Sequence, residues 1–455
     1  MKKYILVIAL VAAVFTLSTC AQTAPAKAKK PAVATEPAAS GTIALRGGRL
    51  LTVSHCEIEN GVLVMQNGKI VAVGGPSTAI PRDAKVIDVT GMTVYPGLID
   101  SETHLGLTEI SAEQSTNDQL EASDEIMPHM HVYDAFHAES ALIPVARING
   151  ITNAVVAPGA GDTLPGQDSF IQLSGKSAEE MILVRDIAMP LNFTGRQRRN
   201  ENFQNSKYPS TRMGMATQLR QAFFDAQDYE VKLAAYEKRK AGGDDKDKPA
   251  PPGMPFKRDL KLEALLPYLH GQRPVIVAAE EPNDLLTALG LANEFHLKVV
   301  LNHVAHSASL LDRIAATGLP VIIGSIYEEP KESERYDAVF KMPAELAKRG
   351  VKIAFASYDA HYVRNLPYTA GYATAFGLPH DTALRAITLS AAEIWGMADK
   401  LGSLDTGKQA NVVVANGDPL DVRTDVKHVF IGGEEIPLVN RQTELRDRYW
   451  GDVKN

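Results

Sequence analysis

Residues Tyr95–Ile110 read YPGLIDSETHLGLTEI, and the fold of the whole chain is decided around this stretch. A short apolar run leads into Asp100, Glu102 and His104, which stand at alternate positions. Alternate residues of an extended strand share one face. The pattern therefore predicts two carboxylates and an imidazole that point the same way at the end of a buried strand, which is how a metal-binding or acid–base site begins.

The composition is typical of a globular protein with a large apolar core. The chain has 455 residues, of which 45% are hydrophobic and 22% are charged, and its formal net charge is −7. This length allows one large α/β domain and a smaller one. The negative charge and the lack of a basic cluster exclude nucleic acid as an expected partner.

Residues 1–20 have the pattern of a secretory signal peptide. Two lysines precede the apolar run Tyr4–Leu17, which is shorter than the roughly 20 residues that a membrane-spanning helix needs. The segment Leu17–Ala21 resembles a bacterial lipobox, in which Cys20 would be lipidated. Ordinary cleavage after Ala21 is the alternative. Either interpretation predicts an exported bacterial protein, periplasmic or anchored to the outer membrane, with no other contact with a membrane.

The mature chain is expected to contain a tether, a central barrel and a β-sandwich whose two segments lie on either side of the barrel in the sequence. Short β-prone runs lie on both sides of a long middle segment, and Asn67-Gly68 between two of them is a strong hairpin signal. The flanking parts are expected to pair as one small composite β-sandwich. The predicted divisions are a flexible tether at 21–41, sandwich segments at 42–95 and 401–440, a barrel at 96–400 with an insertion near 195–260, and a C-terminal tail at 441–455.

The middle segment alternates buried strand-like runs with amphipathic helical stretches. The apolar runs are Thr152–Val156, Val275–Ala279, Lys298–Asn302, Val321–Ile323 and Val351–Phe355. Repeated β–α units of this length predict an α/β fold, a (β/α)₈ barrel like that of triose-phosphate isomerase. A doubly wound sheet is the alternative.

Candidate chemistry lies at the C-terminal ends of these strands, where barrel enzymes place their catalytic groups. Glu102 and His104 follow the first strand, Glu280 follows Val275–Ala279, and His303 and Asp359 follow two later strands. Imidazoles and carboxylates that converge on one opening suit a divalent metal ion such as zinc. Each has a structural interpretation too, because strand-end histidines are often satisfied core residues and acidic residues often cap turns.

Several longer phrases resemble the amidohydrolase superfamily, in its imidazolonepropionase-like branch. These phrases are Tyr95–Asp100, Arg385–Thr388 with Ala391–Ile394, Gly402–Val414 and the turn Asn416–Leu420. The resemblance runs from about Thr42 to Leu438. It implies a (β/α)₈ barrel with a composite β-sandwich, and metal-dependent hydrolysis of non-peptide C–N bonds such as those of cyclic amides.

The resemblance carries over only part of the family's metal-ligand set. His104 matches the second histidine of a His-X-His pair, whereas Glu102 stands at the first. Ala278 occupies the place of the fifth-strand histidine. His303 matches the sixth-strand histidine and Asp359 the eighth-strand aspartate. The resemblance assigns Asp359 to take a proton from metal-bound water and His303 to steady the carbonyl oxygen.

A site for one metal ion, in which carboxylates replace the missing histidines, is the hypothesis that retains metal-dependent hydrolysis. Glu102, His104, Glu280 and Asp359 would hold one divalent ion, and His303 would act as an acid or base. Carboxylate ligands favour manganese or magnesium over zinc.

Two hypotheses for the function follow. The first is an exported amidohydrolase-like enzyme acting on a cyclic amide or a small amide or dipeptide-like substrate. The second is a catalytically silent barrel that serves as a binding or partner subunit. Under either hypothesis, assembly into a homo- or hetero-oligomer is an open expectation.

Overall fold

The structure is a computed structural model that describes residues 41–121, 123–193, 208–209, 211–240, 256–324, 326–331 and 334–450. The predicted signal peptide with Cys20 and the predicted tether up to residue 40 lie outside the described residues. Within the described ranges, no helix combines the length and the apolar character needed to cross a membrane.

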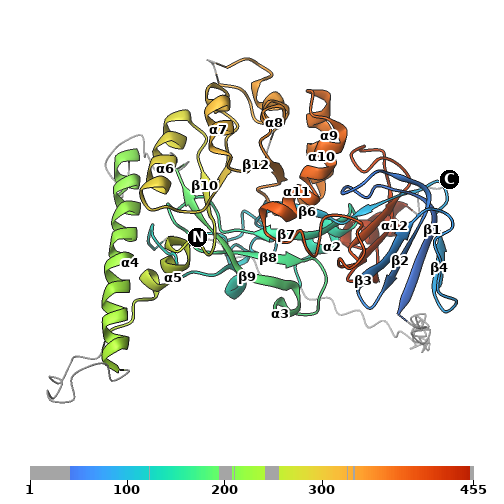
Figure 1. Cartoon of the computed structure of the whole chain (residues 1–455), viewed down its shortest axis with the longest axis horizontal. Coiled ribbons are helices and arrows are strands. Elements are labelled where there is room, and N and C mark those ends of the chain that lie inside the picture. The colour runs from blue at the N-terminus through green and yellow to red at the C-terminus, as the bar shows by residue number, and fades with distance from the viewer. Residues whose placement is uncertain are drawn as a thin grey trace, which may run out of the picture. The chain divides into compact units, whose positions relative to one another are not determined.

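Eight strands form a barrel-like sheet in the order β13-β12-β11-β10-β9-β8-β7-β6 (Figure 1). Their bounds are β6 Leu98–Thr103, β7 Ile151–Val156, β8 Asp168–Gln172, β9 Ile182–Asn192, β10 Val275–Ala278, β11 Val299–Asn302, β12 Val321–Gly324 and β13 Ile353–Ala356. The last strand returns to the first, because the backbone N–H of Tyr358 donates to the carbonyl oxygen of Glu102 at 3.0 Å. The predicted α/β barrel fold is confirmed.

Strand β8 departs from the expected alternation of strands and helices. It pairs antiparallel with both β7 and β9, whereas β6 and β7, and all pairs from β9 to β13, are parallel. The connection over 157–167 contains no helix and lies at the end of the barrel where β7 stops. A short loop of this kind returns the chain antiparallel, since a parallel return needs a crossover.

The helices lie mainly between the later strands. They are α1 Val132–Ala135, α2 Leu142–Arg147, α3 Ala178–Met181, α4 Arg212–Lys240, α5 Leu260–Leu269, α6 Pro282–Glu294, α7 Leu311–Thr317, α8 Ala338–Lys348, α9 Leu366–Ala375, α10 His380–Ala386, α11 Leu389–Ile394 and α12 Arg441–Trp450. Short 3₁₀ helices are η1 Gln114–Thr116, η3 Ala308–Leu310 and η4 Val363–Asn365. The long helix α4 lies beside α6 (Figure 1), to which Arg212 and Arg220 tie it through ion pairs with Asp284 and Glu294.

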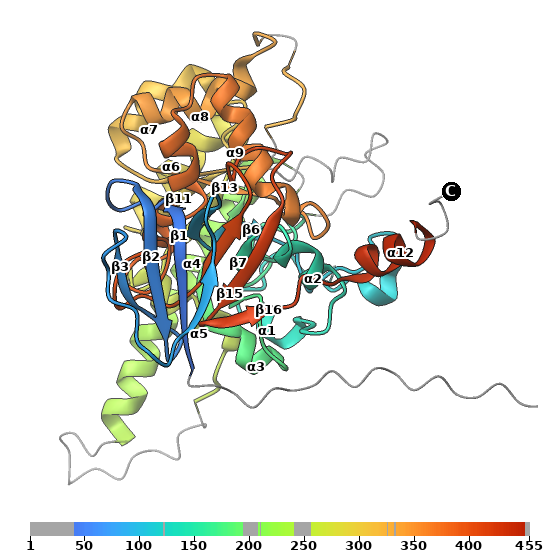
Figure 2. The same cartoon turned by 90° about the vertical axis from the view of Figure 1, so that its right-hand side faces the viewer.

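A second sheet combines both ends of the described chain. It contains β1 Thr42–Leu50, β2 Ile58–Gln66, β3 Lys69–Gly74, β4 Lys85–Asp88, β5 Thr93–Pro96, β14 Val412–Ala415, β15 Val426–Ile431 and β16 Glu434–Ile436. Figure 2 shows the blue N-terminal strands beside the red C-terminal ones, which meet where β5 pairs antiparallel with β14. Asn67 and Gly68 form the turn between β2 and β3 with φ values of 51° and 75°, as a tight hairpin requires.

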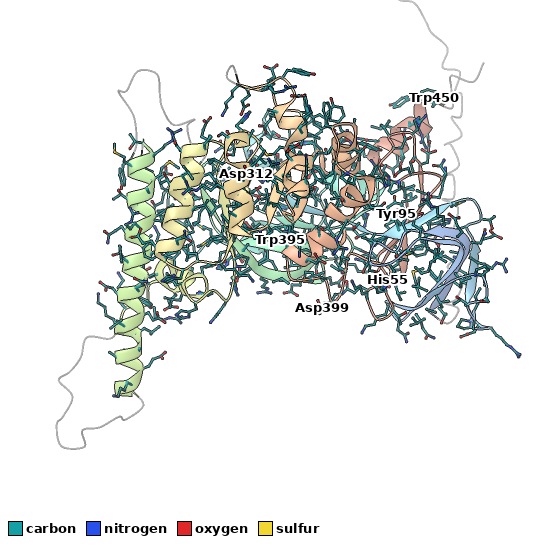
Figure 3. All side chains as sticks on the ribbon, turned by 45° about the horizontal axis from the view of Figure 1, so that its top comes forward. His55, Tyr95, Asp312, Trp395, Asp399 and Trp450 are labelled. Carbon is teal, nitrogen blue, oxygen red and sulfur yellow. The ribbon has the colours of Figure 1, made fainter. Side chains whose placement is uncertain are left out.

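The barrel encloses an apolar interior that fixes the positions of its strand ends. Ile99, Phe170, Ile276 and Val300 belong to this interior cluster and are at most 3% exposed. Trp395, which follows α11, packs into the same cluster (Figure 3). In contrast, Tyr95 of β5 belongs to the larger cluster that extends outward from the barrel strands.

Gly97 joins the two sheets and leaves no room for a side chain. Its N–H donates to the carbonyl oxygen of Asn411 at 2.8 Å, and a Cβ at this position would lie 2.7 Å from the Cβ of Thr152 and closer still to its Oγ1 and Cγ2. Thr152 is fully buried. Gly97 therefore allows β5 to continue directly into β6.

We expect Gly97→Ala to lower the free energy of unfolding by about 1–3 kcal/mol, because overpacking forces the buried Thr152 to shift. Urea denaturation followed by circular dichroism measures the change. The control is Gly290→Ala in α6, where a Cβ meets open space and alanine favours the helix by about 0.5–1 kcal/mol. Equal stability of the two variants would contradict the packing argument.

Candidate active site

Two of the predicted site residues meet at the C-terminal ends of β6 and β11. Glu102 is the penultimate residue of β6, and His303 follows the last residue of β11. Glu102 Oε1 lies 3.9 Å from His303 Nε2, and their side chains are 12% and 16% exposed. This distance allows an ion pair but is longer than a hydrogen bond, so Oε1 keeps its capacity to accept a proton from a small molecule.

Two residues that the sequence analysis did not single out connect this pair. Asn302 is 1% exposed, and its Nδ2 donates to Glu102 Oε2 at 2.5 Å. The Tyr358 hydroxyl donates to Asn302 Oδ1. The Tyr358 ring also stacks on His303, with ring centroids 3.9 Å apart and an angle of 18° between the planes. Glu102, Asn302, Tyr358 and His303 form one network, which we call the strand-end network.

Asp359 and His104 each direct one polar side-chain atom to the backbone. Asp359 Oδ1 accepts the backbone N–H groups of His361 at 2.5 Å and Tyr362 at 2.9 Å, so this carboxylate caps the loop after β13. His104 Nδ1 lies 2.9 Å from the carbonyl oxygen of Ala157. Across the described ranges, no group of three or more His, Cys, Asp or Glu side chains is placed to hold a metal ion.

Glu280 belongs to an acidic cluster beside His303. Burial raises the pKa of Glu328, and the charge of Glu280 raises it further, whereas His303 and His306 lower it. His306 Nε2 lies 3.4 Å from Glu328, and its Nδ1 lies 2.8 Å from Glu334. Glu280 is therefore close to the strand-end network but outside its hydrogen bonds.

Two further carboxylates are buried next to Glu102. Asp100 is fully buried and its Oδ1 accepts the N–H groups of Ser357 at 3.0 Å and Glu102 at 3.3 Å, while Oδ2 has no hydrogen-bond partner in the described part of the chain. Burial raises the pKa of Asp100 to about 7. Burial and the charge of Glu102 raise the pKa of Asp168 as well.

The raised pKa of Asp100 predicts that the free energy of unfolding falls as the pH rises. Between the ordinary carboxyl pKa of about 4 and the folded value of about 7, the folded protein holds a proton that the unfolded chain releases. The contribution of Asp100 to the free energy of unfolding therefore falls as the pH rises through this range. An asparagine side chain at this position would not titrate, yet its amide oxygen would still accept both N–H groups.

We expect Asp100→Asn to flatten the fall in stability between about pH 4 and pH 7, measured by urea denaturation across that range. The control is Asp312→Asn on α7, at a carboxylate that is 92% exposed (Figure 3). The same pH slope in the wild type and Asp100→Asn would contradict the assignment.

Strand-end position was the signal that could have revealed the missed residues. Asn302 directly precedes His303, and Tyr358 directly precedes Asp359, both of which were predicted site residues. Sequence reasoning favoured the residue types that bind metals and passed over an amide and a phenol at the same strand ends.

Comparison with known proteins relates this chain to one family. The model of the amidohydrolase family matches residues 282–436. Amidohydrolase tasK of Hapsidospora irregularis is 25% identical over 397 residues, which cover 83% of this chain and 39% of that protein. The chain therefore spans about two fifths of the length of this curated relative.

Two more similarities support the same family. An imidazolonepropionase of Geobacillus kaustophilus is 50% identical over 54 residues, which are 10% of this chain and 13% of that enzyme. The crystal structure of an amidohydrolase from Thermotoga maritima superposes with a TM-score of 0.77 and 26% identity, and covers 88% of this chain and all of that one. Together with the barrel, its additional sheet and the matched segment, these similarities show that the chain belongs to the amidohydrolase superfamily.

Proposed function

We propose that this chain is a hydrolase of C–N bonds whose active site is the strand-end network. One observation carries the proposal, namely the approach of Glu102 to His303 at 3.9 Å. A carboxylate and an imidazole at the C-terminal ends of barrel strands lie where barrel enzymes hold their catalytic groups. Membership of the amidohydrolase superfamily supports the reaction class.

The proposed reaction uses Glu102 as the general base and His303 as the general acid. Glu102 Oε1 takes a proton from a water molecule, whose oxygen forms a bond to the carbonyl carbon. The C–N bond then breaks, and the leaving nitrogen takes a proton from the His303 imidazolium. Transfer of the proton from Glu102 to His303 restores both groups, and the products are a carboxylic acid and an amine.

Members of this superfamily commonly bind a divalent metal ion, but the described donor atoms do not fit one. Glu102 Oε2 already accepts from Asn302, and Asp359 Oδ1 caps a loop. Ala278, at the place of a histidine in the resemblance, offers no donor atom. Metal dependence, with Glu102, His104, Glu280 and Asp359 as ligands, therefore stays a prediction of the sequence, and the reaction above contains no step through a metal.

The proposed substrate is a small molecule with a cyclic amide or a small amide or dipeptide-like bond. The match of a short segment to an imidazolonepropionase supports the cyclic class. The signal-peptide pattern supports export, with Cys20 as the lipid-bearing residue if the lipobox is used. Assembly into a homo- or hetero-oligomer is part of the same proposal.

We expect Glu102→Gln to lower kcat/KM at least about 100-fold, because glutamine has no basic oxygen but still accepts the hydrogen bond from Asn302. Hydrolysis of a panel of hydantoins, dihydropyrimidines, N-acyl amino acids and dipeptides is followed by mass spectrometry. Glu179→Gln, at an exposed position in α3, is the matched control and should leave activity unchanged.

Two results would overturn the proposal. One is turnover by Glu102→Gln equal to that of the wild type. The other is a folded wild type that hydrolyses no member of the panel, which would support the catalytically silent alternative.

A further inference from the structure

We infer that Asn302 and Tyr358 are positioning residues that together hold Glu102 and His303 through hydrogen bonds and a ring stack, at strand ends where the family resemblance places metal ligands. The catalytic part of this inference rests on the proposed function. The structural part is that the strand ends bind no metal ion and that Tyr358 stacks on His303, and both points have tests that need no activity.

Asn302 is the centre of the network. Its Nδ2 donates to Glu102 Oε2 at 2.5 Å, while its Oδ1 accepts the backbone N–H of His303 at 3.0 Å and the hydroxyl of Tyr358. These partners leave one orientation of the amide, because the carboxylate only accepts and the N–H and O–H groups donate. A buried amide with all of these bonds fixes the carboxylate relative to the start of the loop that carries His303.

Tyr358 connects both members of the catalytic pair. Its hydroxyl orients Asn302, and its ring covers the imidazole of His303 at a centroid distance of 3.9 Å. Burial and the charge of Glu102 raise the pKa of Tyr358 well above its ordinary value, so the phenol stays a neutral donor. Its backbone N–H also closes the barrel onto Glu102.

The backbone at these two positions indicates that their placement is not incidental. His303 has a φ of 55° and Tyr358 a φ of 52°, in the left-handed region that non-glycine residues rarely adopt. Such conformations cost free energy and persist only where the surroundings enforce them, which happens most often at functional sites. His303 directly follows β11 and Tyr358 lies two residues after β13, so these turns lie where the two rings stack on each other.

The same atoms account for the poor fit to a metal ion. Glu102 Oε2 already accepts a hydrogen bond from Asn302, so only Oε1 of this carboxylate is left for a metal ion. Metal ligands must present free lone pairs to a common point. In this chain, Asp359 Oδ1 faces backbone N–H groups and Ala278 has no donor atom, so no set of three or more ligands forms among the described residues.

The structural test measures metal uptake and the ring stack without using activity. The wild type is dialysed against ZnCl₂ or MnCl₂, then against metal-free buffer, and its metal content is determined. We expect less than about a tenth of an equivalent. Uptake of about one equivalent that Glu102→Gln abolishes would overturn the inference.

Nuclear magnetic resonance of histidine-labelled protein reports the stack, with the His303 signals assigned through His303→Gln. We expect the ring protons of His303 to lie upfield in the wild type and in Tyr358→Phe, and to lose this shift in Tyr358→Leu. Unchanged His303 signals in Tyr358→Leu would overturn the inference. Both readouts remain informative if no substrate is hydrolysed, so failure of the proposed function is recognised separately.

The catalytic test separates positioning from a structural role. Because the Asn302 amide holds the Glu102 carboxylate in place, Asn302→Ala should lower kcat about 10-fold or more with little change in KM. We expect Tyr358→Phe to lower kcat about 10-fold or more with little change in KM, whereas the exposed Tyr362→Phe should change neither. Full kcat in Asn302→Ala, together with full kcat in Tyr358→Phe, would contradict the positioning role.

Discussion

The hydrogen bond from the N–H of Tyr358 to the carbonyl oxygen of Glu102 closes the barrel, and the rest of the site depends on it. A second link runs in parallel, from the N–H of Ser357 to the buried carboxylate of Asp100. The two links hold the end of β13 against β6, although these strands are separated by more than two hundred residues. Since closure brings Tyr358 over His303, one backbone contact both completes the sheet and assembles the strand-end network.

The closure also explains how carboxylates are retained inside an apolar barrel. Asp100 Oδ1 accepts two backbone N–H groups, and Oδ2 has no hydrogen-bond partner in the described residues. Asp168 is similarly buried, and its Oδ1 has no hydrogen-bond partner within the part of the chain that the structure describes. Buried carboxyl groups of this kind avoid the cost of a buried charge by keeping their protons.

Much of the fold could be predicted because it follows from local patterns. Val275–Ala278 and Val299–Asn302 are apolar runs of strand length, and both form buried barrel strands. Asn67-Gly68 makes its hairpin through backbone conformations that these residue types adopt easily. Strand β8 was not predicted, since Asp168–Gln172 (DSFIQ) contains only two apolar residues and is not an apolar run of strand length. Its antiparallel course depends on the length of the preceding loop.

The sequence by itself determined the barrel with its additional sheet and placed Glu102 and His303 at strand ends, because hydrophobic periodicity and turn residues act over a few positions. Only the tertiary structure decided which polar groups meet. Asp359 matches a family position by sequence, yet its carboxylate caps a loop, and Asn302 and Tyr358 reach Glu102 and His303 instead. The direction of a side chain at a strand end depends on the turn that follows and on partners from distant strands, and the order of residues along the chain encodes neither of these locally.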